Sequence, residues 1–248
     1  MLLKDKVGVV TGGGSGIGRS TALAMAREGA SVMIAGRREE PGLAVVDEIR
    51  SGGGQASFVG TDVSKVDDCK TLMEAIDKKF GRLDLAFNNA GGHFDFVNLD
   101  ETTIEEADWV FDVNLKGTYY CMKYQASLML DSGGGSIVNN SSIFGVKAMP
   151  MLAHYVAAKH GVVGLTRAAA LDFAKRDIRV NAVCPGAIKT PAYDRITGGD
   201  EHAYDDAIPM GHLGGSRDIA ESVIWLMSDQ AAFVTGAVLS VDGGMSAM

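Results

Sequence analysis

The sequence predicts an α/β fold in which helices cover both faces of a doubly wound parallel sheet. Short β-rich runs alternate with longer stretches of helical periodicity along the chain, which is the pattern of βαβ units. Runs such as Val7–Val10 are also continuously apolar, whereas antiparallel strands with one solvated face alternate apolar and polar residues. In such a sheet, ligands bind outside the carboxyl ends of the strands.

Seven runs are expected to form the sheet, because each is rich in β-branched or small apolar residues and is followed by turn signals or a helical pattern. Glycine-rich spots at Gly52–Gly54, Gly133–Gly135 and Gly198–Gly199 are too short to link domains and predict turns. With no internal repeat and no low-complexity tract, we expect one domain over residues 1–248. The expected strands are Val7–Thr11, Ser31–Ala35, Ala56–Gly60, Leu83–Phe87, Ser136–Asn139, Arg179–Val183 and Ala237–Val241.

The composition narrows the class of partner. The chain has 248 residues, of which 46% are hydrophobic and 22% charged, which is ordinary for a globular protein with a substantial core. No stretch approaches the roughly 18 apolar residues of a membrane helix. The formal net charge of −8 opposes a phosphate backbone, and no basic stripe offsets it. We expect neither a membrane nor a nucleic-acid partner.

The cysteines and the amino-terminal residues bear on the compartment. Cys69, Cys121 and Cys184 lie far apart in the sequence, with no CxxC and no histidine at ligand spacing. This argues against a disulfide framework and a metal site, and favours buried cysteines in a reducing environment. The apolar run at Val7 follows the first six residues directly and leaves no room for a signal peptide. We expect a cytoplasmic enzyme.

A glycine-rich turn joins the first expected strand to a helical pattern. It reads Thr11-Gly12-Gly13-Gly14-Ser15-Gly16-Ile17-Gly18. Glycines let the backbone approach a pyrophosphate, and the free N–H groups of the following helix bind the anion. The spacing G-x-x-x-G-x-G differs from the general dinucleotide fingerprint G-x-G-x-x-G, so a turn without a nucleotide is the alternative. We predict a Rossmann-type site formed by Gly12, Ser15, Gly16, Ile17 and Gly18.

The end of the second strand decides between the two nicotinamide cofactors. NAD enzymes place an acidic side chain there, on the adenine ribose, but this chain has Gly36 followed by Arg37 and Arg38. The two arginines can hold a 2′-phosphate through charge-assisted hydrogen bonds. We predict NADP(H) over NAD(H). The alternative is that both arginines are solvated charges at the start of the next helix.

Residues after the third and fourth strands complete the expected cofactor site. Asp62 and Val63 are placed to border the adenine, and Asn89-Ala90-Gly91 follows the fourth strand. For the pair Asn88-Asn89, ordinary turn chemistry is an equally good explanation, because asparagine tolerates strained backbone and caps helices.

Tyr155 and Lys159 stand four residues apart in a helical segment, so their side chains project from the same face. A cation beside the phenol can lower its pKa toward neutrality. Tyr119 and Lys123 have the same spacing. Only the first pair is preceded by a hydroxyl at the end of an apolar strand, that of Ser142, where it can face the cleft.

Six motifs then occur in one order along the chain. They are Thr11-Gly12-x-x-x-Gly16-x-Gly18, Asn88-Asn89-Ala90-Gly91, Asn114 in Val113-Asn114-Leu115-Lys116-Gly117, Ser142, Tyr155-x-x-x-Lys159, and Pro185-Gly186-x-Ile188-x-Thr190. With these motifs the chain resembles, over nearly its whole length, the short-chain dehydrogenases/reductases of the compact single-domain type. The glycine spacing is that family's own pattern.

The resemblance implies hydride transfer between a secondary alcohol and a ketone. Tyr155 would be the general acid/base, and Ser142 would hold the substrate oxygen. Lys159 would lower the pKa of the tyrosine and bind the nicotinamide ribose, and Asn114 would anchor a water that relays protons. Residues of the last motif would contact the nicotinamide end of the cofactor, namely Pro185, Gly186, Ile188 and Thr190.

The resemblance also implies a homotetramer, with residues 241–248 and the helix of Tyr155 at interfaces. One departure concerns the cofactor. NADP-preferring relatives often have a basic residue just before the second motif glycine, where this chain has Ser15. Arg37 is therefore the main support for NADP(H).

Two rival functions remain open at this point. An epimerase or dehydratase on the same scaffold would need a longer chain to build a substrate domain. A cofactor-binding regulator without turnover would have lost part of the catalytic set, which is intact here.

The segment from about 190 to 214 has the weakest pattern and is predicted to be a substrate lid. The aromatic residues Phe94, Phe144 and Tyr193 suggest a medium-sized carbocyclic, sugar-like or aromatic substrate without strong charge. Other side chains that could reach the substrate are His93, His154, Met149, Met151 and Met210.

Overall fold

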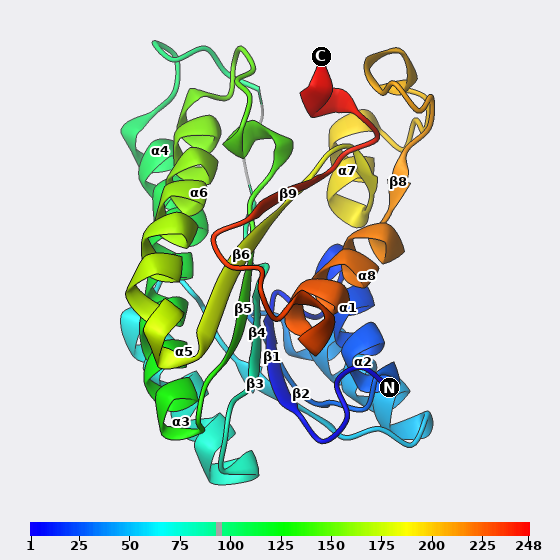
Figure 1. Cartoon of the computed structure of the whole chain (residues 1–248). Coiled ribbons are helices and arrows are strands. Elements are labelled where there is room, and N and C mark those ends of the chain that lie inside the picture. The colour runs from blue at the N-terminus through cyan, green and yellow to red at the C-terminus, as the bar shows by residue number, and fades with distance from the viewer. Residues whose placement is uncertain (93–95) are drawn as a thin grey trace.

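The computed structural model describes residues 1–92 and 96–248, so the predictions for His93 and Phe94 lie outside the described residues. Its central feature is a seven-stranded parallel sheet with the order β3-β2-β1-β4-β5-β6-β9 (Figure 1). The predicted doubly wound α/β fold is confirmed. The strands are β1 Val7–Thr11, β2 Ser31–Gly36, β3 Ala56–Gly60, β4 Leu85–Asn88, β5 Gly135–Asn140, β6 Ile178–Pro185 and β9 Val238–Val241.

Two layers of helices bury the sheet, as continuous apolar strands require. In Figure 1, α1, α2 and α8 lie on one side of the sheet, and α3, α5 and α6 lie on the other. The main helices are α1 Gly16–Arg27, α2 Glu39–Ser51, α3 Val66–Phe80, α4 Ile104–Phe111, α5 Gly117–Asp131, α6 Ala153–Phe173, α7 Pro191–Thr197 and α8 Ser216–Met227.

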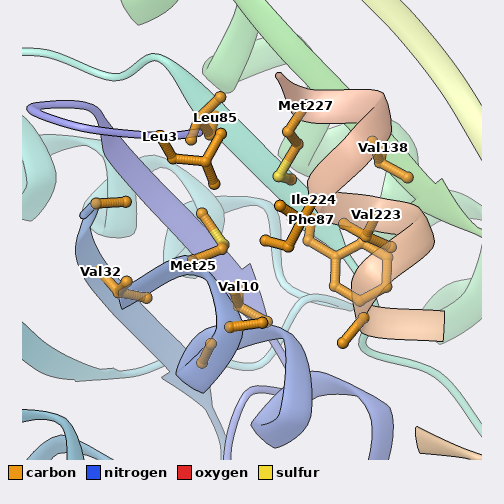
Figure 2. Close-up of a cluster of buried hydrophobic side chains, with 14 of the residues drawn as sticks. Leu3, Val10, Met25, Val32, Leu85, Phe87, Val138, Val223, Ile224 and Met227 are labelled. Atoms are coloured by element: carbon orange, nitrogen blue, oxygen red, sulfur yellow. The ribbon is translucent and has the colours of Figure 1, made fainter. Parts of the chain in front are cut away.

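Each helical layer has its own apolar core. Figure 2 shows the first, where Met25 of α1 and Val223 of α8 pack with Phe87 and Val138 of the sheet. The second core lies on the opposite face and joins α3, α5 and α6 to the sheet. The sheet is therefore packed on both faces, and the loops at the carboxyl ends of its strands extend from this packed core.

The strand order reverses between β1 and β4. The chain runs from β1 outward to β2 and β3, and then returns to place β4 on the other side of β1. At such a switch point the loops on the two sides diverge and leave a crevice for ligands. The loop after β1 and the loop after β4 border this crevice.

Two short strands lack a counterpart in the sequence prediction. They are β7 Ile188–Lys189 and β8 Gly214–Gly215, which form a separate parallel pair. They tie together the two ends of the segment predicted to be a lid, which also contains α7 and a short 3-10 turn at Asp205–Ala207.

The cysteines are free and buried. The sequence separation of Cys69 and Cys121 is misleading, because their sulfur atoms lie 3.6 Å apart in the fold. Within the described ranges, no helix has both the length and the apolar character needed to span a bilayer.

Candidate active site

A cavity of about 700 Å³ opens at the carboxyl ends of the strands. This volume lies within the range of small-molecule sites, about 300–1,000 Å³. Its lining includes every predicted cofactor residue except Gly18, together with Ser142, Tyr155 and Lys159. The sequence motifs, which are spread from residue 12 to residue 190, therefore meet around one cavity.

The glycine turn brings the start of α1 to this cavity. Ser15 is the N-cap residue of α1, but its side chain makes no capping hydrogen bond, and the first turn of the helix has no acidic residue. The helix N–H groups and the positive end of its dipole are thus available to an anion. Gly12 and Gly16 have φ of +63° and +52°, which side chains rarely adopt.

Gly18 was predicted to bind the cofactor, and it lies behind the residues that line the cavity. A Cβ at this position would lie 2.3 Å from the carbonyl oxygen of Gly12. The glycine therefore permits close packing of α1 against the turn after β1.

The end of β2 presents an open surface to the cavity. A Cβ at Gly36 would meet nothing within 4 Å, and Arg37 and Arg38 line the cavity beside it. Arg38 Nη2 lies 3.5 Å from Ser15 Oγ. Neither arginine forms an ion pair with a carboxylate of the described residues, although Glu39 begins α2 directly after them.

The loop after β4 is tied to the glycine turn through Thr11. The Thr11 hydroxyl accepts hydrogen bonds from the N–H groups of Asn89 and Ala90, both at 3.0 Å. The Asn89 amide donates to the carbonyl oxygens of Thr11 and Gly12 at 3.0 and 3.3 Å. Asn89 thus has the predicted turn chemistry and also lines the cavity.

Asn114 lies in a short π-helical turn, Asp112–Lys116, and is completely buried. Its amide donates to the carbonyl oxygens of Gly92 at 2.7 Å and Val110 at 2.9 Å, and its Oδ1 accepts from the Gly92 N–H at 3.1 Å. Asn114 does not line the cavity. Its side chain instead clamps the loop that follows β4.

Gly91 fills the narrow space between this clamp and the catalytic helix. A Cβ added to Gly91 would lie 2.7 Å from Asn114 Oδ1 and 3.4 Å from Lys159 Nζ. Only glycine lets the loop pass between these two groups without displacing them.

Tyr155 and Lys159 project from the first turns of α6, and Ser142 faces them from the N-cap of the 3-10 turn Ile143–Gly145, after β5. Ser142 Oγ accepts a hydrogen bond from the Phe144 N–H at 3.1 Å. Lys159 Nζ donates to the Asn140 carbonyl oxygen at 3.0 Å.

Burial dominates the electrostatics of this group. It raises the pKa of Tyr155 to about 12, although a hydrogen bond with Ser142 acts in the opposite direction. Burial also lowers the pKa of Lys159 to about 8. The expected lowering of the tyrosine pKa by the lysine is outweighed by this burial. Tyr155 is therefore a neutral phenol, and a proton donor, at pH 7.

The second Tyr-x-x-x-Lys pair lies elsewhere. Tyr119 is half exposed on α5 and, like Lys123, does not line the cavity. Among the other candidates for substrate contact, Phe144, Met149 and Tyr193 line the cavity, whereas Met151, His154 and Met210 do not.

Several lining residues were missed by the sequence analysis. Asn140 could have been found, because it ends a strand beside Asn89 and donates to its side-chain oxygen at 3.0 Å. The others carry no pattern that distinguishes them from core residues. They include Phe96, Leu152, Ala187 and Met245.

The residues present fit a nicotinamide dinucleotide. A helix start free of acidic groups suits the pyrophosphate, glycines keep the wall of the cavity open, and the buried Lys159 ammonium suits ribose hydroxyls. The residues that would hold the cofactor come from the loops after β1, β2, β3, β4 and β6.

Comparisons with known proteins agree with this geometry. Residues 12–246 match a family model described as "Enoyl-(Acyl carrier protein) reductase". The chain is 43% identical over 250 residues to 2,5-dichloro-2,5-cyclohexadiene-1,4-diol dehydrogenase of Sphingobium indicum, covering 99% of each protein. It is 44% identical over 239 residues to cyclohexanol dehydrogenase of an Acinetobacter species, covering 96% of this chain and 94% of the relative. The crystal structure of levodione reductase superposes with a TM-score of 0.94 at 34% identity, covering 99% of each chain.

The fold, the cavity and these relatives define the class as nicotinamide-dependent oxidoreductases. The chain belongs to the short-chain dehydrogenase/reductase family. It is an NAD(P)(H)-dependent enzyme that interconverts a secondary alcohol and a ketone by hydride transfer, with tyrosine as the acid/base of the family's reaction.

Proposed function

We propose that this enzyme prefers NADP(H) and acts on an uncharged carbocyclic secondary alcohol or its ketone, with Tyr155 as the general acid/base. The observation that carries the proposal is the convergence of Ser142, Tyr155 and Lys159 on one end of a cavity whose other end is bordered by Arg37 and Arg38.

Each catalytic residue has a distinct task. A nicotinamide held by Lys159 and the loop after β6 would supply the hydride chemistry, as donor in reduction and as acceptor in oxidation. In reduction, Tyr155 donates its phenolic proton to the substrate oxygen; in oxidation, the same oxygen atom removes the alcohol proton. Ser142 holds the substrate oxygen with a hydrogen bond.

Lys159 and Asn114 support this proton transfer. Lys159 binds the nicotinamide ribose and, when protonated, stabilises the Tyr155 phenolate. The family resemblance assigns Asn114 a relay water; the bonds of its side chain to Gly92 support a role in holding the loop after β4.

The lining of the reactive end suits a ring without charge. Phe144, Met149, Leu152 and Tyr193 line the same cavity as Tyr155 and supply no ionised group, and the charged residue that α7 adds to the lining is Arg195. Two relatives are named for alcohols of six-membered carbocycles, cyclohexanol and a dichlorocyclohexadienediol. These names and the apolar lining support a medium-sized cyclic substrate.

The preference for NADP(H) rests on the end of β2. Arg37 and Arg38 have no carboxylate partner in the described ranges and line the cavity beside the open space at Gly36. A 2′-phosphate there would receive two guanidinium groups. Gly36 also stands where NAD enzymes place the acidic residue that binds the ribose hydroxyls.

One pair of measurements tests the proposal. Calorimetric titration with NADPH and NADH under equal conditions is expected to show at least tenfold tighter binding of NADPH, which corresponds to about 1.4 kcal/mol. Equal or tighter binding of NADH would overturn the NADP(H) preference. Turnover of cyclohexanol is expected to exceed that of a 2-enoyl thioester, the substrate class that the family model's description suggests; the reverse order would overturn the carbocyclic assignment.

The assembly, location and lid are further parts of the proposal. We expect a cytoplasmic homotetramer, with residues 241–248 and α6 at interfaces, and a segment at about 190–214 that closes over the substrate. Sedimentation velocity tests the tetrameric state, because the mass derived from it should be four times the 26.0 kDa of one chain.

A further inference from the structure

The last residues of the described chain fold back over the reactive end of the cavity. We name residues 243–248 the C-terminal hook. After β9 the chain turns at Gly243 and Gly244, whose φ values are +62° and +92°. The Asp242 carboxylate then accepts hydrogen bonds from the N–H groups of Gly244 at 3.0 Å and Ser246 at 2.8 Å. This closes the hook into a compact turn, drawn in red at the C-terminus in Figure 1.

The hook contacts both the cavity and the segment predicted to be the lid. Met245 lines the same cavity as Tyr155 and Met149. The Gly243 carbonyl oxygen accepts a hydrogen bond from the Met210 N–H at 3.1 Å. A Cβ at Gly243 would lie 2.7 Å from Ile208, so the two segments pack directly together.

The side chain of Lys147 binds the backbone of the C-terminal hook. Lys147 Nζ donates to the backbone oxygens of Met245 at 2.9 Å and Met248 at 2.8 Å. Lys147 itself belongs to the loop that begins at Ser142, and its N–H donates to the Ile143 carbonyl oxygen at 2.9 Å. The same ammonium makes no ion pair with a side-chain carboxylate of the residues that the structure describes.

These contacts connect the loop of Ser142 to the part of the cavity wall that Met245 forms. Ser142 and Lys147 lie in one loop, and the Lys147 side chain binds the backbone oxygen of Met245. A charged donor on two backbone oxygens is a strong and directional contact. Methionine fills irregular space and adapts to a neighbour, so the position of its backbone decides how much room remains for a substrate ring.

We propose that the C-terminal hook is the wall that limits substrate size, and that Lys147 is a positioning residue that sets the place of this wall. The proposal rests on the carbocyclic substrate class proposed above. Met245 contacts the substrate ring, and Lys147 acts only through the hook. Loss of either is expected to widen the reactive end of the cavity and leave the cofactor end unchanged.

The test compares a small and a large ring in four variants. Cyclohexanol and the bicyclic decahydro-2-naphthol are assayed with wild type, Met245→Ala, Lys147→Met, Lys147→Arg and the control Lys175→Met, which removes an exposed lysine far from the cavity lining. Met245→Ala and Lys147→Met are expected to raise the ratio of kcat/KM for the large over the small alcohol at least fivefold. The change is expected in KM, with kcat altered less than twofold.

The controls separate positioning from general damage. Lys147→Arg keeps a cationic donor and is expected to restore most of the wild-type ratio, and Lys175→Met is expected to match wild type. Unchanged NADPH affinity and unchanged sedimentation show that the variants are folded and assembled. An unaltered substrate ratio in folded Met245→Ala and Lys147→Met would overturn the proposal.

A second measurement does not depend on the substrate. Hydrogen exchange of the Ser246 and Met210 amides is expected to be at least tenfold faster in Lys147→Met than in wild type, because the hook is released. Equal exchange rates would overturn the role of Lys147. If wild type turns over neither alcohol, the carbocyclic assignment fails by itself, and the exchange experiment still decides whether Lys147 holds the hook.

Discussion

The Nζ atom of Lys159 lies 5.5 Å from the centre of the Tyr155 ring, and both groups are buried at the reactive end of the cavity. Burial favours the neutral form of each, so it raises the pKa of the phenol and lowers that of the ammonium. Tyr155 therefore holds its proton at neutral pH. Alcohol oxidation needs the phenolate, and carbonyl reduction needs the phenol.

The two directions of the reaction should differ in pH dependence. We expect kcat/KM for alcohol oxidation to rise with pH between 6 and 8, by up to tenfold per unit, because the phenolate fraction grows below a raised pKa. Ketone reduction is expected to stay nearly constant over this interval. Initial rates in both directions check this, and an oxidation rate that is already flat from pH 6 would contradict a raised tyrosine pKa.

The lowered pKa of Lys159 should also be visible in stability. The folded value of about 8 lies below the ordinary 10.5, so between these pH values the unfolded chain binds more protons and stability rises with pH. Relative to Lys159→Met, wild type should therefore gain about 2 kcal/mol of unfolding free energy between pH 7 and 9.5. Urea unfolding of both proteins measures it. The Lys175→Met protein serves as control and should show the same pH dependence as wild type. If the unfolding free energy of wild type rises no more than that of Lys159→Met between pH 7 and 9.5, the effect of burial on the Lys159 pKa is contradicted.

Gly91 should be intolerant of a side chain. In Gly91→Ala the new methyl group would lie 2.7 Å from Asn114 Oδ1, so the clamp on the loop after β4 must shift. We expect at least tenfold weaker NADPH binding and a comparable further loss of kcat, measured by calorimetry and steady-state kinetics.

The matched control for Gly91 is Gly52→Ala. Gly52 is the exposed C-cap residue of α2, with φ of −82°, and a Cβ there would come no nearer than 3.5 Å to another heavy atom. Its replacement should leave cofactor binding and activity unchanged. Gly91→Ala with normal affinity and rate would show that the loop can move without consequence.

The charge at the end of β2 should control cofactor choice. Arg37→Ala is expected to weaken NADPH binding at least tenfold and to change NADH binding less than threefold, because only the former has a 2′-phosphate. Arg217→Ala, which removes an exposed arginine of α8, is the control. If Arg37→Ala leaves the ratio of the two affinities unchanged, the arginine is a surface charge.

Most of the sheet could be predicted because buried parallel strands are continuous apolar runs. Val7–Thr11 and Ala56–Gly60 have the predicted bounds. β4 begins two residues later than predicted, at Leu85, because the preceding Asp84 carboxylate accepts hydrogen bonds from the Val7 N–H and from Arg82. Two-residue strands such as Gly214–Gly215 exist only through tertiary pairing and have no period to detect.

The residues of the candidate site could be predicted where they carry a reactive side chain at a recognisable spacing. They could not be predicted where they reach the cavity only through the way the chain folds. Ser142 distinguished Tyr155 from Tyr119 in the sequence, and the structure gives these two tyrosines different surroundings. The spacing of the glycines could not show that Gly18 packs against the turn after β1, whereas Gly16 lines the cavity. Met245 reaches the cavity only because the chain folds back after β9, which no local pattern indicates.

The central claim is that Tyr155 transfers the proton in a cofactor-dependent oxidoreductase, and Tyr155→Phe tests it most directly. The substitution removes one hydroxyl and keeps the ring, and Tyr119→Phe is the control with the same sequence spacing to a lysine. Steady-state oxidation of cyclohexanol and calorimetric NADPH binding are measured for both variants. We predict that Tyr155→Phe loses at least about 10³-fold in kcat with cofactor affinity within threefold of wild type, and that Tyr119→Phe matches wild type. A Tyr155→Phe enzyme that retains more than a tenth of wild-type kcat would contradict the account.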